Sequence, residues 1–279
     1  MKKLKLFVTL TLINLMLISC SDDKSKKSNG DEADHKTEKN KELLALERDP
    51  RVIGPEKPEE QKAIEEALIK LDKFSENQLL GFWIGDFGNN KINLALFEVN
   101  DDKVSGYSIC AGNYREIEGK VVNNNDEVIS LVMDEPGDDP YDGTFTFDVN
   151  LKDMSIKGSW VPFVEKGNTA KNYTLEKKIF KYNPSVGDFP EASERILTED
   201  EVANNYDIEE LKIMRNEIYA RHGYSFKNKE MRFLFNKKDW YMPMGVDIRG
   251  KLTDIEARNI DLIYRYEEYY EDTFDDFGR

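Results

Sequence analysis

The run Thr144-Phe145-Thr146-Phe147-Asp148-Val149 alternates strictly between polar and apolar side chains. A period of two residues is typical of a β-strand that has one face on a core and the other in water. The same alternation recurs over residues 92–96, and comparable runs lie near 104–110, 114–122, 127–133, 154–161 and 173–180. The sequence therefore predicts about eight short strands between Gly81 and Phe180.

Turn-forming residues separate these runs, as in Asn100-Asp101-Asp102, Asn123-Asn124-Asn125-Asp126 and Gly137-Asp138-Asp139-Pro140. Such short connections join antiparallel neighbours as hairpins. If the strands close into a small up-and-down barrel, no strand edge stays unpaired. We expect an antiparallel β-barrel over residues 78–182 as the first folded domain.

The C-terminal region has helical periodicity instead. Residues 183–192 contain two prolines and a glycine and are interpreted as a linker, and 193–272 as an all-helical domain. Three pairs have the spacing of a capping box: Thr198 with Glu201, Asp207 with Glu210, and Thr253 with Glu256. The predicted fold class is thus α+β and multidomain, with the barrel first and the helices second.

The start of the strand region, Leu79-Leu80-Gly81-Phe82-Trp83, resembles the Gly-x-Trp start of lipocalin-like proteins. No arginine late in the strand region matches the one that lipocalins place against that tryptophan. The resemblance implies a barrel shape. It leaves two alternatives open for the interior: a cavity for a small apolar ligand, or a core filled by the barrel's own side chains.

A second resemblance covers about residues 198–270. The pentapeptide Tyr219-Ala220-Arg221-His222-Gly223 is followed by Phe226, by Phe233 and by the segment 239–243, Asp-Trp-Tyr-Met-Pro. Motif, spacing and helical frame resemble the YARHG domain of extracellular bacterial proteins, which is named after this pentapeptide. The family has no established biochemical activity, and its context suggests binding to the cell wall or envelope.

The candidate binding residues of this region are Arg221, His222, Trp240 and Tyr241. His222 shares a helical face with Met214 and Ile218, which favours a structural histidine. Trp240 fits a core position equally well. Aromatic platforms with flanking charge also suit sugars and peptides, so the alternative is a site in which Arg221 and Tyr241 contact the ligand.

The N-terminus predicts export and a lipid anchor. Three lysines precede an apolar run from Leu6 to Ile18, and Leu17-Ile18-Ser19-Cys20 resembles the lipobox of bacterial lipoproteins. Residues 1–19 would be the signal peptide and Cys20 the lipidated residue. Polar residues 20–58 would form a disordered tether, and 59–75 an amphipathic helix. Ser21 directly after the cysteine is similar to the signal of lipoproteins that are sorted to the outer membrane. The protein would then lie on the periplasmic or the surface face of that membrane.

Net charge and composition exclude several classes of binding partner and metal site. Loss of residues 1–19 removes three lysines and no acid, so the net charge changes from −15 to −18, which disfavours a nucleic-acid partner. Two histidines and one cysteine besides Cys20 exclude metal sites that need several such ligands. Asp138, Asp139 and Asp142, near Asp134 and Glu135, are calcium candidates in one loop, although acids on an exposed turn are usually only solvated. No cofactor is expected.

The leading functional hypothesis is a non-enzymatic envelope lipoprotein. It would be held to the membrane through Cys20 and would act as a binding or assembly module for cell-wall or envelope components. One alternative is a lipocalin-type carrier. The other is a carboxylate-dependent cell-wall hydrolase, but no segment singles out a catalytic pair of acids and no Gly-x-Ser-x-Gly motif occurs.

Overall fold

The computed structural model describes residues 57–73, 76–125, 127–165, 169–248 and 250–273. The expected signal peptide and Cys20 lie outside the described residues, and so does nearly all of the expected tether. Among the residues described, no helix combines the length and the apolar character that are needed to cross a bilayer.

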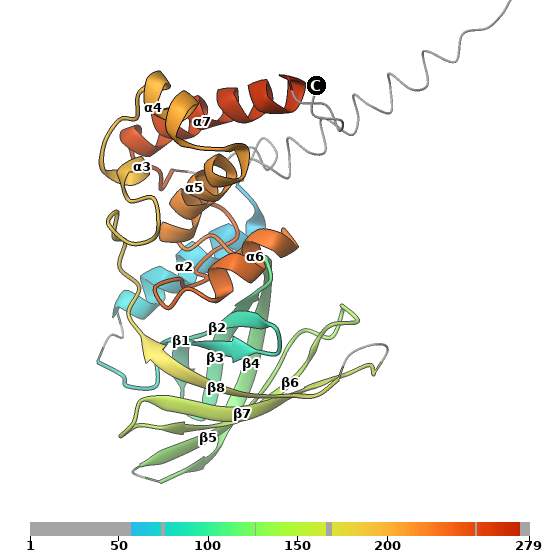
Figure 1. The fold of residues 1–279 in the computed structure, drawn as a ribbon. Helices are drawn as coiled ribbons and strands as arrows, with labels where there is room; N and C mark the ends of the chain where they lie inside the picture. The colour runs from blue at the N-terminus through green and yellow to red at the C-terminus, as the bar shows by residue number, and fades with distance from the viewer. Residues whose placement is uncertain (1–56, 74–75, 126, 166–168, 249, 274–279) are drawn as a thin grey trace, which may run out of the picture. The chain divides into compact units, whose positions relative to one another are not determined.

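Eight antiparallel strands form a closed barrel in which every strand pairs with its neighbours in the chain, and β1 pairs with β8 (Figure 1). The strands are β1 (Gly81–Phe87), β2 (Asn90–Asn100), β3 (Lys103–Cys110), β4 (Asn113–Asn124), β5 (Val128–Asp134), β6 (Gly143–Asn150), β7 (Ser155–Pro162) and β8 (Lys171–Lys178). The barrel that the alternating runs predict is therefore confirmed.

Large apolar side chains fill the barrel interior. The inward positions of the alternating runs form a single buried cluster that includes Trp83, Leu94, Phe145, Phe147 and Leu175. The indole N–H of Trp83 donates to the carbonyl of Leu79, 3.1 Å away and two residues before β1 begins. This packing supports the filled-core alternative for the interior of the barrel.

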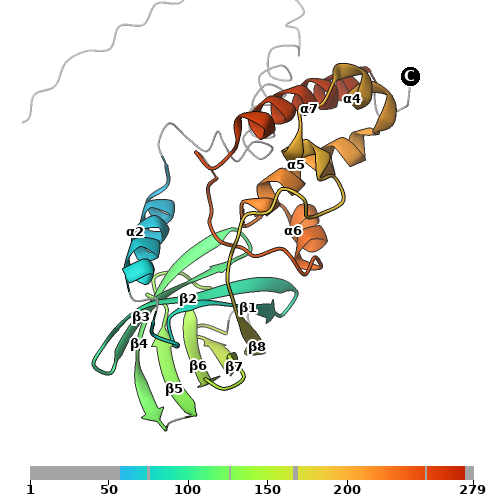
Figure 2. The same ribbon diagram turned by 90° about the vertical axis from the view of Figure 1, so that its left-hand side faces the viewer.

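Helix α2 (Glu59–Lys73) packs against the outer face of β2 (Figure 2). Its buried residues Ile64 and Ala67 form a cluster with Ala95, Tyr107 and Ile109 on the outside of the barrel. The apolar side of the predicted amphipathic helix therefore covers the one stretch of β2 and β3 whose outward residues are also apolar.

The C-terminal helices are α3 (Glu191–Glu194), α4 (Glu199–Asn205), α5 (Ile208–Arg221), α6 (Lys229–Asn236) and α7 (Asp254–Thr273). Reciprocal hydrogen bonds confirm the capping boxes of Thr198 with Glu201 and of Asp207 with Glu210. Thr253 and Glu256 exchange the same bonds at the start of α7. The helical class of this region is thereby confirmed.

Hydrogen bonds link the barrel to the helical part, and both fall in one compact unit of the chain. Asn93, which is fully buried on the outer face of β2, donates to the carbonyl of Pro243 at 3.0 Å. The ammonium of Lys91 donates to the carbonyls of Lys238 and Tyr241. The side chain of Gln61 in α2 accepts from the backbone N–H groups of Val246 and Asp247. The segment 238–247 is therefore held by both the barrel and α2.

Candidate functional site

The Tyr-Ala-Arg-His-Gly pentapeptide ends α5, and its first two residues are core. Tyr219 and Ala220 are both buried. The guanidinium of Arg215, one turn earlier, lies 5.9 Å from the Tyr219 ring centroid and forms a buried pair with Glu267 of α7. These residues fix α5 against α7.

Arg221 holds the segment that precedes the helical domain. Its side chain is fully buried, pairs with Glu217 one turn earlier, and donates to the carbonyls of Val186 and Phe189, each at 2.8 Å. Glu217 in turn accepts from the backbone N–H groups of Asp188 and Phe189, both at 2.8 Å. The predicted linker is therefore bonded along its backbone to this ion pair.

His222 extends this arrangement to α7. Its Nε2 atom lies 2.7 Å from the Glu256 carboxylate, and its ring stacks on Tyr182 with 4.6 Å between centroids. The Tyr182 hydroxyl donates to Glu256 at 3.1 Å, and burial beside this carboxylate raises the pKa of Tyr182 to about 12. His222 thus has the buried structural position that its helical face predicts.

Gly223 is required by backbone geometry. Its φ of +77° lies in the left-handed region. A β-carbon there would lie 2.6 Å from the β-carbon of Met244. The Gly223 carbonyl accepts from the N–H groups of Met244 and Gly245, so this tight approach joins the helix end to the segment that contacts the barrel.

The other two candidate binding residues lie beside this segment. Tyr241 is buried and donates its hydroxyl to the carbonyl of Tyr224 at 2.8 Å, while Trp240 is half-buried and packs against Phe235 and Tyr241. The structure therefore gives Arg221, His222 and Tyr241 internal partners and does not gather the four side chains into one open hollow. A ligand contact by any of them stays a prediction.

The acidic loop between β5 and β6 is organised by an arginine. The buried carboxylate of Asp142 accepts from Arg115 Nε at 2.6 Å and from the N–H groups of Gly137 and Asp139. Asp138 is exposed. Within the described ranges, no group of three or more His, Cys, Asp or Glu residues is arranged to hold a metal ion, and Asp142 acts as the hydrogen-bond centre of a turn.

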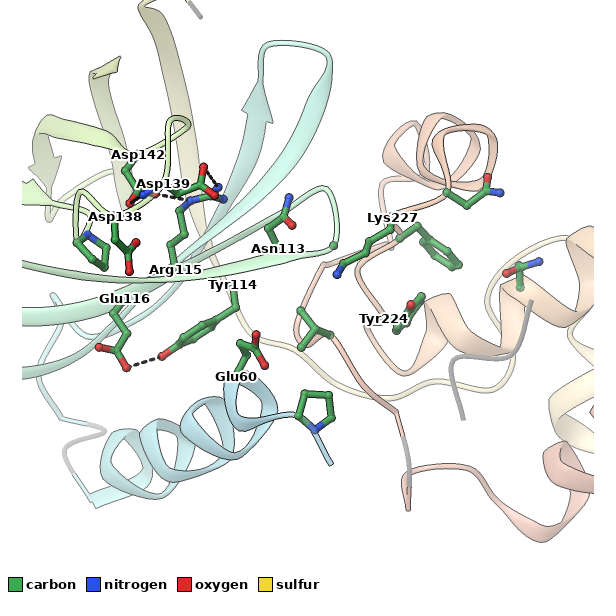
Figure 3. A pocket seen from close by; sticks show the side chains of 17 residues that line it. Glu60, Asn113, Tyr114, Arg115, Glu116, Asp138, Asp139, Asp142, Tyr224 and Lys227 are labelled. Atoms are coloured by element: carbon green, nitrogen blue, oxygen red, sulfur yellow. Dashed lines mark hydrogen bonds and ion pairs between the residues drawn. The ribbon is translucent and has the colours of Figure 1, made fainter. Parts of the chain in front are cut away.

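An open groove of about 730 Å³ lies between the barrel, α2 and the segment after the pentapeptide (Figure 3). Its walls combine aromatic rings with charged and amide side chains. They include Glu60, Asn113, Tyr114, Arg115, Glu116, Asp138, Asp139, Asn216, Tyr224, Phe226, Lys227 and Asn228.

Several polar groups of the groove are available to a ligand. The Tyr224 hydroxyl and the Lys227 ammonium have no hydrogen-bond partner among the residues that the structure describes, and burial raises the pKa of Tyr224 to about 12. Opposite them, Tyr114 lies beside Glu60 and Glu116, with its hydroxyl 3.5 Å from the Glu116 carboxylate (Figure 3). Because its pKa is raised, the Tyr224 hydroxyl stays protonated at neutral pH and can donate a hydrogen bond to a ligand.

Sequence reasoning missed the groove, because its residues come from at least five segments that are far apart in the sequence. No short motif joins Glu60, Tyr114, Asp138 and Lys227. Two signals were available: the groove wall at Tyr224, Phe226 and Lys227 directly follows the pentapeptide, and the acidic loop singled out for calcium forms another part of the wall.

Together these features define a protein built from an eight-stranded antiparallel barrel and a helical domain with the Tyr-Ala-Arg-His-Gly motif at the end of its central helix. Residues 188–268 match the family model of the YARHG domain, which confirms the resemblance of the C-terminal part. Neither the comparison with curated proteins nor the comparison with solved structures returned a match.

Proposed function

We propose that this protein is a lipid-anchored component of the bacterial cell envelope whose groove binds wall or envelope material without catalysing a reaction. The observation that carries the proposal is the groove of about 730 Å³ between the barrel and the YARHG domain. Its volume lies within the range that is usual for ligand sites.

The chemistry of the groove walls suits a sugar or peptide chain. Tyr114, Tyr224 and Phe226 offer ring faces, and Asn113, Asn228 and Lys227 offer hydrogen-bonding groups close to them. Because the groove is partly open to solvent, a segment of an extended polymer can enter it from the side.

Three further features support the location. The YARHG match favours an extracellular or envelope setting. The lipobox-like Leu17-Ile18-Ser19-Cys20 supplies a membrane anchor without a spanning helix, and Ser21 favours the outer membrane. The net charge of −15 disfavours nucleic acid as a partner.

The test is co-sedimentation of the purified full-length chain with peptidoglycan sacculi and, separately, with envelope extract. Tyr224→Phe removes only a hydroxyl without a partner among the described residues, and Lys227→Ala removes an exposed ammonium, so both should keep the fold and bind severalfold more weakly. Lys157→Ala, an exposed lysine of β7 outside the groove lining, should bind like the parent chain. Equal binding by all four proteins, or no binding by the parent chain, would overturn the proposal.

A further inference from the structure

A second hollow, of about 380 Å³, lies at one end of the barrel. Phe87, Phe145 and Trp160 form an apolar wall, and the charged residues of the lining are Arg115, Glu135, Asp139 and Lys171. It adjoins the groove, since Arg115 lines both. It differs from the groove in that its lining comes from the barrel strands and the turns between them, and the rings of Phe87, Phe145 and Trp160 also belong to the barrel core.

Lys171 has an unusual position in this hollow. Its ammonium lies 4.1 Å from the Trp160 ring centroid and 4.9 Å from that of Phe87. Pairing of β7 with β8 places Trp160 directly opposite Lys171. Among the residues that the structure describes, the ammonium has neither an ion pair nor a hydrogen-bond acceptor, so its three N–H donors are open to the hollow.

The neighbouring acids are already engaged by other donors. Glu135 accepts from the Trp160 indole at 3.0 Å, from the Gly143 N–H at 2.8 Å and from the Ser108 hydroxyl at 3.4 Å. Asp142 is bonded to Arg115 and to two backbone N–H groups. Burial raises the pKa of Glu135 and lowers that of Lys171. Lys171 is therefore the cation of the hollow that the fold itself leaves without a counter-charge in contact.

A charged donor in an aromatic-walled hollow selects for the opposite charge. A ligand cation would compete with the Lys171 ammonium for the same ring faces and would be repelled by it. A dianion such as phosphate would place two charges near Glu135 and Asp139. A carboxylate carries a single charge and accepts charge-assisted hydrogen bonds from an ammonium.

We propose that the hollow at the barrel end binds the carboxylate group of a ligand, with Lys171 as its cation and Trp160 and Phe87 as the apolar wall beside it. The carboxylate could belong to a small apolar acid or to the C-terminus of a peptide. This site does not require the groove to bind wall material, because none of the groove variants above alters a residue of the hollow.

Calorimetric titration of the full-length chain tests the proposal with two acids and their matched amides. The probes are phenylpropionate with phenylpropionamide, and acetyl-D-alanyl-D-alanine with its C-terminal amide. We expect at least one acid to bind roughly tenfold more tightly than its amide. The acid that binds identifies the source of the carboxylate, and inorganic phosphate should bind more weakly than that acid.

Two variants locate the binding. Lys171→Gln keeps a side chain of similar length without the charge and should lose the preference for the acid. Lys157→Gln, an exposed lysine of the neighbouring strand, should keep it. Equal affinity for acid and amide in the parent chain, stronger binding of phosphate, or no binding of either acid would refute the proposal. These three results are obtained with the parent chain, so they test the proposal even if the Lys171→Gln protein does not fold. An unchanged preference in folded Lys171→Gln would also refute it.

Discussion

Replacement of Arg221 by Ala should unfold the protein at a much lower temperature. The substitution leaves the buried Glu217 carboxylate without its cation and removes the bonds to the carbonyls of Val186 and Phe189. Loss of one partner from a buried ion pair costs about 3–5 kcal/mol. For a unit of roughly 200 residues each kcal/mol lowers the melting temperature by about 2–4 °C, which gives a decrease of about 6–20 °C.

Circular dichroism melts of the full-length chain would measure this shift, and urea titration would give the free energy of unfolding. The matched control is Arg265→Ala. Arg265 also forms an ion pair with a glutamate, at 3.2 Å, but both side chains are about two-thirds exposed. An exposed pair contributes about 0–1 kcal/mol, so this variant should melt within a few degrees of the parent chain.

A double-mutant cycle with Glu217→Gln separates the ion pair from the other bonds of Arg221. The coupling energy between the two substitutions should lie near the upper end of the range of roughly 0.5–3 kcal/mol that is found for neighbouring residues. The reasoning would be refuted if Arg221→Ala melted with the parent chain yet no longer bound the wall, because Arg221 would then be a ligand residue.

Three other predictions concern the anchor, the pentapeptide and acid stability. Cys20→Ala should leave an unprocessed or soluble chain, and incorporation of labelled palmitate into that variant would contradict the anchor. Gly223→Ala should lower the free energy of unfolding, measured by urea titration, by about 2 kcal/mol or more, because the left-handed backbone and the close Met244 both oppose a β-carbon. The control is Gly250→Ala, which has a similar φ of +79° and no atom within 4 Å of the added β-carbon, and it should lower this free energy by only about 1–2 kcal/mol. Burial alone would raise the pKa of Glu256, but its hydrogen bond to His222 and the bonds from Thr253 and Ser193 hold this pKa below 4.5. The stability that this carboxylate contributes is therefore complete above about pH 4.5 and is lost as the pH falls through the lower pKa of the folded state. Glu256→Gln should make the melting temperature depend less on pH in that acid range.

The sequence is sufficient to predict the barrel because the residues of several strands alternate between apolar side chains that face the core and polar side chains that face solvent. In the run from Thr144 to Val149 every second residue is apolar, and those residues point into the core. Helix starts are equally local, since Thr198 and Asp207 satisfy backbone N–H groups only three residues away. Such patterns extend over only a few neighbouring residues, so they can be identified without knowing the rest of the fold.

The candidate site could not be predicted in the same way, because strand register and helix docking create it. Trp160 and Lys171 are opposite each other only through the pairing of β7 with β8. The prolines and glycine of residues 183–192 predict a linker, but composition does not reveal the bonds of this segment to Arg221 and Glu217. Gly187 belongs to this contact, since a β-carbon there would lie 2.3 Å from the Glu217 carboxylate carbon.

The contacts of the pentapeptide bear on what a YARHG match can mean for function. Arg221 and Glu217 hold the segment that enters the domain, His222 stacks on Tyr182, which lies before that segment, and Gly223 bonds the segment that rests on the barrel. Each residue of the signature that makes a specific contact thus makes it inside the chain. The groove, by contrast, takes one wall from the barrel and α2 and only the other from the YARHG domain. In this chain the signature residues therefore join the domain to the segment that precedes it, and under the proposed function the barrel side of the groove, through residues such as Tyr114 and Asn113, would set the ligand specificity.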